Sequence, residues 1–258
     1  MLDWREIWKY RYFLQNLVAR DLKVKYKRSV LGFLWTFINP LLMVTILVMV
    51  FRLVVKIQME SYWAFILSGY FAWNTISTTV YAATYTLQEH GPMARNVAFP
   101  KEIVLLSAVM TRLIEFSLEI TLVTAALLIM HHGGVPAATV LLPVLLVAQF
   151  VLSVGIALPV SILSVLFSDV QHALPVILTG LFYFTPIFYP VSFVPEGWRN
   201  LWYLNPFAPL LTSYQAVLYH GTWPARGDLI ALGAHAVFWL LVGGAVFRSR
   251  REVISELV

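Results

Sequence analysis

The 258-residue sequence contains no cysteine, which excludes disulfides and thiolate metal sites. Charge is also scarce: 12% of the residues are charged, against roughly 25% in soluble globular domains. No G-x-x-x-x-G-K-[ST] loop occurs, so the chain is not expected to hydrolyse ATP through that motif. Acids are scattered singly, and His131 and His132 lack a third ligand, so we expect neither catalytic nor metal-binding residues.

Apolar residues dominate what remains. They make up 60% of the chain, the mean hydropathy is +0.77, and they gather in long runs. The composition therefore predicts an all-α polytopic membrane protein. The first thirty residues are charged and amphipathic, so no cleavable signal peptide is expected.

Six of these runs are long enough to cross a bilayer, because twenty helical residues cover about 30 Å. The predicted transmembrane spans are 31–55, 62–87, 103–130, 137–167, 173–189 and 229–247. Together with their connections they form one predicted domain, 1–258.

Lysine and arginine are distributed unevenly about these spans. Thirteen of the 18 fall in 1–32, 88–102 and 248–258, and four fall at the opposite ends of the spans. Because loops rich in Lys and Arg stay in the cytoplasm, both termini are predicted to be cytoplasmic.

Residues 1–29 combine Trp, Tyr and Leu on one side of a helix with Lys, Arg and Glu on the other. This pattern favours an amphipathic helix in the cytoplasmic membrane interface, although a soluble partner-binding helix has the same pattern. Membrane topology and contact with anionic lipid headgroups explain its cations better than nucleic-acid binding does. The cations could also attract the diphosphate of a lipid-linked substrate. These cations are Arg20, Lys23, Lys25, Lys27 and Arg28.

Two connections are longer than turns. The inner one, 88–102, holds Pro92 and Pro100, which could bound a short helix. The outer one, 191–228, is rich in aromatics and is predicted to form two short amphipathic helices, 196–204 and 209–218, that rest on the outer membrane face or re-enter it.

The third span carries Arg112, Glu115 and Glu119 at positions i, i+3 and i+7. An ionised group at mid-bilayer costs roughly 2.5–3.5 kcal/mol on insertion scales, so each should have a partner. Arg112 and Glu115 can pair within the helix. The cluster could be a structural polar clasp or take part in proton coupling.

With these pieces placed, the chain resembles the membrane subunit of ABC-2 type exporters, and in particular the polysaccharide and O-antigen export permeases, relatives of capsule and teichoic-acid exporters. The most specific match is R-D-L-K-x-K-Y-K-x-S-x-L-G-x-L-W-x-x-x-x-P, from Arg20 to Pro40. The others are Phe99-Pro100-Lys101-Glu102, and Val194-Pro195 with Leu204-Asn205-Pro206, followed by Tyr214 and Gly221. One departure is Ser168, which precedes Asp169 where many members have a basic residue.

The resemblance implies a homodimeric permease in the bacterial inner membrane, driven by a separate ATPase subunit that binds ATP and Mg²⁺. It implies a coupling helix in 88–102 that docks on the ATPase. The implied contact residues are Glu89, Arg95, Phe99, Pro100, Lys101 and Glu102.

It also places the first and fifth spans along a channel in which sugar rings could stack on aromatic side chains. Aromatics near helix ends could instead form interfacial belts. The candidate channel residues are Phe33, Trp35, Phe37, Tyr70, Trp73, Phe182, Tyr183 and Phe184. The candidate outer-gate residues are Trp198, Trp202, Asn205, Pro206 and Tyr214.

The expected function is ATP-driven export of a lipid-linked, O-antigen-like polysaccharide. The alternatives are an ABC-2 exporter of a teichoic acid, a drug, haem or a small lipid. Two alternatives belong to other classes of protein. One is a membrane enzyme that acts on polyprenyl lipids, which would need clustered acids or histidines. The other is a passive channel.

Overall fold

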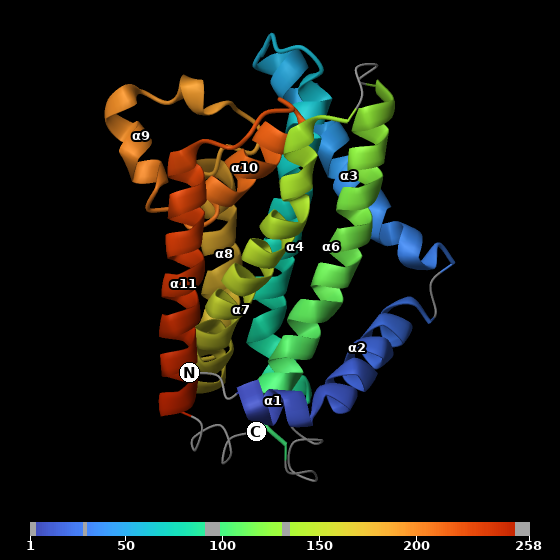
Figure 1. Cartoon of the computed structure of the whole chain (residues 1–258), viewed down its shortest axis with the longest axis vertical. Helices are drawn as coiled ribbons and strands as arrows, with labels where there is room; N and C mark the ends of the chain where they lie inside the picture. The colour runs from blue at the N-terminus through green and yellow to red at the C-terminus, as the bar shows by residue number, and fades with distance from the viewer. Residues whose placement is uncertain (1–3, 28–29, 91–98, 131–134, 251–258) are drawn as a thin grey trace.

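The computed structural model describes residues 4–27, 30–90, 99–130 and 135–250, and every regular element within them is helical (Figure 1). The long helices are α3 (Trp35–Met49), α4 (Tyr62–Glu89), α6 (Glu102–Met130), α7 (Leu142–Leu166), α8 (Asp169–Phe184) and α11 (Arg226–Ser249). The shorter helices are α1 (Trp4–Lys9), α2 (Arg11–Tyr26), α9 (Glu196–Trp202) and α10 (Ala208–Leu218). Single turns η1 (Gly32–Leu34), η2 (Val50–Val54), η3 (Ala137–Leu141) and η4 (Val191–Phe193) extend or join them.

The long helices α4, α6, α7 and α11 run along the long axis of the bundle (Figure 1). One end, here called the α1 end, holds α1, the end of α4, the start of α6 and the end of α11. The opposite end, here called the α9 end, holds α9. Helix α2 lies obliquely across α6, and η1 turns the chain from α2 into α3 (Figure 1).

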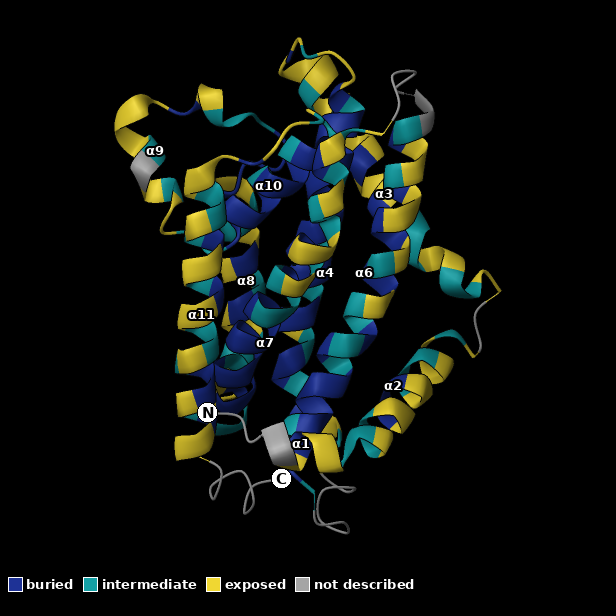
Figure 2. Cartoon of the chain, viewed as in Figure 1, coloured by how far each residue is buried: buried dark blue, intermediate teal, exposed yellow. Residues whose placement is uncertain are grey.

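Helix α4 is the centre of the bundle. It packs against α3, α6, α7, α8 and α10, and most of its residues are buried (Figure 2). Its buried hydroxyls donate to carbonyl oxygens of their own helix: Ser68 Oγ to Phe65 O at 2.7 Å, and Thr79 Oγ1 to Thr75 O at 2.6 Å. Such bonds satisfy polar groups where no water is available, so a helix with this polar content can stay inside the bundle.

Three helical stretches in the described part of the chain are long and apolar enough to cross a membrane: Gly32–Val54, Ala137–Leu166 and Arg226–Ser249. Their outward faces carry large exposed apolar side chains, as lipid-facing helices do. Helix α8 has 16 residues, which span about 24 Å. Six spans therefore stay a prediction, whereas the all-helical, largely apolar architecture is confirmed.

The helix bounds differ from expectation in two places. The expected single helix 1–29 is divided at Tyr10 into α1 and α2. Helix α8 begins at Asp169 and ends at Phe184, whereas 173–189 was expected, because Pro186 forces Thr185 into an extended conformation with ψ 139°. The second outer helix, α10, has almost the expected bounds and is mainly buried against α4, α7 and α11.

Helices α7 and α11 approach very closely at two glycines. A Cβ atom on Gly243 would lie 2.2 Å from the carbonyl oxygen of Gly155, and one on Gly155 would lie 2.6 Å from the backbone nitrogen of Leu240. Small residues at such crossings let helix backbones pack tightly in a membrane. The crossing joins the last helix to the rest of the bundle.

Candidate functional site

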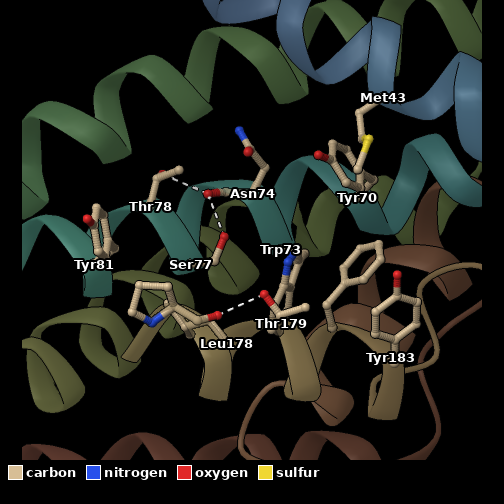
Figure 3. A pocket seen from close by; sticks show the side chains of 12 residues that line it. Met43, Tyr70, Trp73, Asn74, Ser77, Thr78, Tyr81, Leu178, Thr179 and Tyr183 are labelled. Carbon is tan, nitrogen blue, oxygen red and sulfur yellow. Dashed lines mark hydrogen bonds between the residues drawn. The ribbon is translucent and has the colours of Figure 1, made fainter. Parts of the chain in front are cut away.

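An aromatic groove of about 440 Å³ lies between α3, α4 and α8 (Figure 3). Met43 borders it from α3, Tyr70 and Trp73 from α4, and Phe182 and Tyr183 from α8. The Phe182 ring contacts the other three rings edge-on or at a tilt. Its centroid lies 6.3 Å from that of Tyr70, 5.9 Å from that of Trp73 and 5.3 Å from that of Tyr183. This geometry fixes the rings with respect to one another while the groove stays open.

The groove's aromatic wall is continued by hydroxyls along α4 and α8. Thr78 Oγ1 donates to Asn74 O at 2.7 Å, and Thr179 Oγ1 donates to Pro175 O at 2.8 Å (Figure 3). Trp73 is buried, whereas Tyr183 is 60% exposed. The groove thus offers flat apolar faces and hydroxyl oxygens, and none of the side chains that line it is charged.

The eight candidate channel residues do not all come together. Tyr70, Trp73, Phe182 and Tyr183 line the groove. Phe184 is exposed beyond it. The other three lie near the α2–α3 turn: Phe33 packs edge-on against Tyr26 and Phe37, and Trp35 lines a separate cavity.

A second cavity, of about 900 Å³, lies between α2, α4 and α6 toward the α1 end, and is here called the basic cavity. Its three cations, Arg20, Lys25 and Arg112, outnumber its two acids, Asp21 and Glu89, and His90 also lines it. Arg20 Nη2 donates to Asp21 Oδ1 at 2.9 Å and also to His90 Nε2. The other candidate headgroup residues lie elsewhere: Lys23 and Lys27 are exposed and do not line it, and Arg28 lies outside the described residues.

Glu115 joins α2 to the middle of α6. Lys25 Nζ donates to both of its carboxylate oxygens at 2.8 Å, Tyr26 Oη donates to Oε1, and Arg112 Nη1 donates to Oε2 at 3.3 Å. The carboxylate is 3% exposed, so these three donors replace water around it. Burial lowers the pKa of Lys25, as does nearby Arg112, while the hydrogen bond to Glu115 opposes the shift. The local Arg112–Glu115 pair forms as expected, and Lys25 joins it from another helix.

Glu119 lies one turn further along α6, beside a cavity of about 220 Å³ enclosed by α2, α3, α4 and α6. No hydrogen bond or ion pair within the described residues reaches its carboxylate, and its Oε2 is buried. Asn39 and Asn74 line the same cavity. Sequence reasoning missed both amides, although an asparagine within an apolar span was a usable signal.

Most of the candidate outer-gate residues lie at the α9 end. Asn205 Nδ2 donates to Thr185 Oγ1 at 2.8 Å, and Asn205 Oδ1 accepts from the Phe207 nitrogen at 3.0 Å. Pro206 follows in the same turn. Trp198 is exposed, Trp202 packs edge-on against Tyr189, and Tyr214 is buried against Phe116.

Of the candidate ATPase contacts, Arg95 lies outside the described residues. Glu89 ends α4, and Phe99 packs against Phe13 with ring centroids 4.8 Å apart. Pro100 is buried, and Lys101 and Glu102 are half-buried at the start of α6. The end of α4 and the start of α6, which flank this connection, both lie at the α1 end (Figure 1).

A hydrogen-bond network that sequence reasoning did not find joins the end of α4 to α7 and α8. Gln171 Nε2 donates to Gln88 Oε1 at 3.1 Å and to Ser164 Oγ at 3.2 Å, and Ser164 Oγ donates to Thr84 O at 2.7 Å. The first turns of α8, a helix that lines the aromatic groove, are thereby tied to the base of the 88–102 connection. Within the described ranges, no three His, Asp or Glu side chains converge as metal ligands would.

A family model described as ABC-2 type transporter matches residues 12–219. The O-antigen export system permease protein RfbA of Myxococcus xanthus is 35% identical over 257 residues, 98% of each chain. RfbA of Klebsiella pneumoniae is 29% identical over 94% of this chain and 93% of its own. The polysialic acid transport protein KpsM of Escherichia coli is 23% identical over 93% and 94%.

Proposed function

Because the chain belongs to the ABC-2 type transporter family, we propose that it is the transmembrane permease subunit of an ATP-driven exporter of polysaccharide. The substrate class is an O-antigen-like glycan linked to a lipid carrier, moved across the bacterial inner membrane. The observation that carries this assignment is 35% identity to an O-antigen export permease over 98% of both chains. The chain is therefore a transport subunit and not an enzyme.

The energy comes from a separate ATPase subunit that binds ATP and Mg²⁺, since this sequence has no phosphate-binding glycine loop. The docking element is the connection 88–102. Two observations support it: the helices that flank this connection end together at the α1 end, and the Gln171 network ties its base to α8. A push on this connection would therefore reach a wall of the aromatic groove. The α1 end is the cytoplasmic end in this proposal, and α9 and α10 form the outer gate.

The aromatic groove is half of the glycan path, and a second copy of the chain supplies the other half. This is supported by exposed apolar side chains on α3 and α8, the two helices on either side of the groove, including Ile46, Met49, Val176 and Phe184. A face of this kind needs lipid or protein against it. Two copies facing each other would enclose a tunnel lined by aromatic rings and hydroxyls.

The lipid diphosphate of the substrate binds in the basic cavity. Arg20 and Arg112 are its principal ligands, because a guanidinium binds phosphate oxygens in a fixed bidentate geometry. Thr78 and Tyr81 border both this cavity and the aromatic groove. A carrier held by its diphosphate would therefore have its glycan chain close to the aromatic rings.

Deletion of the gene and complementation test this function. The deletion strain should lose surface polysaccharide and accumulate lipid-linked polysaccharide inside. The wild-type gene should restore export, whereas a chain with 88–102 replaced by a Gly/Ser linker should insert in the membrane without restoring it. Surface polysaccharide that persists in the deletion strain, with no redundant permease present, would contradict the proposal.

A further inference from the structure

The cavity beside Glu119 is distinct from both the aromatic groove and the basic cavity, and is here called the Glu119 cavity. Its volume is about 220 Å³. Most of the side chains that line it carry a polar group, and they come from α2, α3, α4 and α6. The lining residues used below are Trp35, Asn39, Asn74, Thr78, Glu115 and Glu119.

The two acids of this cavity differ in how their charge is compensated. Glu115 accepts from Lys25, Tyr26 and Arg112, so its hydrogen-bonding capacity is taken up. Glu119 is equally buried at 3% exposure, yet no donor of the described residues reaches it. A carboxyl group inside a membrane domain requires a hydrogen-bond partner or a proton, and the two cations that line the cavity, Lys25 and Arg112, pair with Glu115 and not with Glu119.

Two amides extend the unused hydrogen-bonding capacity. The side chains of Asn39 and Asn74 make no hydrogen bond within the described part of the chain. Figure 3 shows the Asn74 side chain pointing away from α8, on the side of α4 opposite to Thr179. An amide both donates and accepts, so the two asparagines and Glu119 together offer acceptors and donors to one occupant.

We infer that the Glu119 cavity binds the hydroxyl groups of one sugar ring of the exported glycan, held by Glu119, Asn39 and Asn74 and flanked by the Trp35 ring. This inference rests on the proposed function and adds a specific binding site to a path that is otherwise non-specific. Hydroxyls donate to a carboxylate and exchange hydrogen bonds with amides, and a sugar's C–H face packs on an indole.

Other occupants fit less well. An anion would lie beside two acids, Glu115 and Glu119, and both cations that line the cavity, Lys25 and Arg112, already pair with Glu115. A metal ion would need more carboxylates than the cavity provides. The volume is below the 300–1,000 Å³ of most ligand pockets and suits one ring.

The position of the cavity along the path supports this occupant. Asn74 and Thr78 border both this cavity and the aromatic groove, and Thr78 also borders the basic cavity. A glycan whose diphosphate lies in the basic cavity would therefore have its first sugar beside Glu119.

Export assays of two isosteric replacements test the chemistry of the site. Glu119→Gln keeps hydrogen bonds to hydroxyls and should reduce export about threefold, whereas Glu119→Leu leaves the sugar hydroxyls unpaired and should reduce it more than about tenfold. Both are compared at equal membrane levels. Equal loss in the two variants would mean that the charge is what matters, as for a proton or cation, and would overturn the inference.

Thiol protection tests occupancy directly, because the chain has no native cysteine. Thr36→Cys, at a lining residue that is not one of the proposed sugar ligands, reports the Glu119 cavity, and Thr179→Cys reports the aromatic groove. Each is used in the complex with an ATPase that binds ATP without hydrolysing it. A membrane-permeant maleimide is applied to cells that make the lipid-linked polysaccharide and to cells that do not. We expect the polysaccharide to slow labelling of both thiols.

The outcomes separate the two proposals. Protection of the thiol in Thr179→Cys but not in Thr36→Cys would leave the proposed export path intact and overturn the Glu119 site. Protection of neither thiol would contradict the proposed glycan path itself.

Discussion

Lys25 and Glu115, ninety residues apart in sequence, form an ion pair in which the lysine Nζ lies 2.8 Å from both carboxylate oxygens. It holds the amphipathic helix α2 against the middle of α6. The same lysine lines the basic cavity and the Glu119 cavity. The helix that carries the basic motif of the sequence is therefore fixed at a point where two cavities meet.

Removal of Glu115 should release α2 from α6. Glu115→Ala leaves Lys25, Tyr26 and Arg112 without their shared acceptor, and since the two cations are 35% and 31% exposed, we expect a loss of about 1.5–3 kcal/mol. Lys25→Ala should cost less, since the lysine is 35% exposed and two donors to Glu115 remain. Thermal unfolding of the detergent-solubilised protein measures both. A larger loss for Lys25→Ala than for Glu115→Ala would contradict this account.

The α7–α11 crossing should tolerate no side chain at Gly243. In Gly243→Ala the new Cβ would lie 2.2 Å from Gly155 O, so the helices must separate. We expect a lower melting temperature and a lower yield of folded protein. Gly244→Ala is the matched control, because no heavy atom lies within 4 Å of a Cβ there. Equal stability of the two variants would show that the helices do not cross as described.

Export should depend on the aromatic face of Tyr183. Tyr183→Ala removes one ring from the groove, and because the side chain is 60% exposed the fold should survive. An aromatic contact contributes about 0.5–1.5 kcal/mol, so a two- to tenfold loss of export is expected. Tyr183→Trp should retain most of the export. The control is Phe238→Ala on the outer face of α11, which is similarly exposed and lies outside the groove.

Diphosphate binding in the basic cavity should depend on one cation of α2 and not on its neighbour. Arg20 lines the cavity and Lys23 does not. Arg20→Gln should therefore weaken binding of a short-chain polyprenyl diphosphate to the purified complex about tenfold or more, since a charge-assisted hydrogen bond is worth about 1.5–3 kcal/mol. Lys23→Gln should have little effect. A similar loss in both variants would indicate non-specific attraction to anionic lipid.

The sequence was informative where the physical signal is local. Apolar runs with helical lengths predicted the long helices, and Pro206 correctly divided the outer segment into two helical pieces. Pro186, which follows Thr185, also signals the end of α8 in the sequence. We placed the end later because the apolar run continues to Tyr189.

Contacts between distant segments could not be read in the same way. Arg112 and Glu115 were recognisable as a pair because they are three residues apart on one helix. Nothing local indicates that Lys25 lies beside them, or that Gln171 reaches Gln88. These contacts depend on how whole helices pack, so the cavities at Asn74 and Thr78 became visible only in the structure.

Reconstitution is the most direct test of the central claim, that this chain moves polysaccharide only with the energy of a partner ATPase. The purified permease–ATPase complex is placed in vesicles with a lipid-linked polysaccharide and Mg-ATP, and the glycan that crosses the membrane is measured. We predict that transport requires both subunits and ATP hydrolysis. Equal transport by the permease alone, without ATP, would contradict the account.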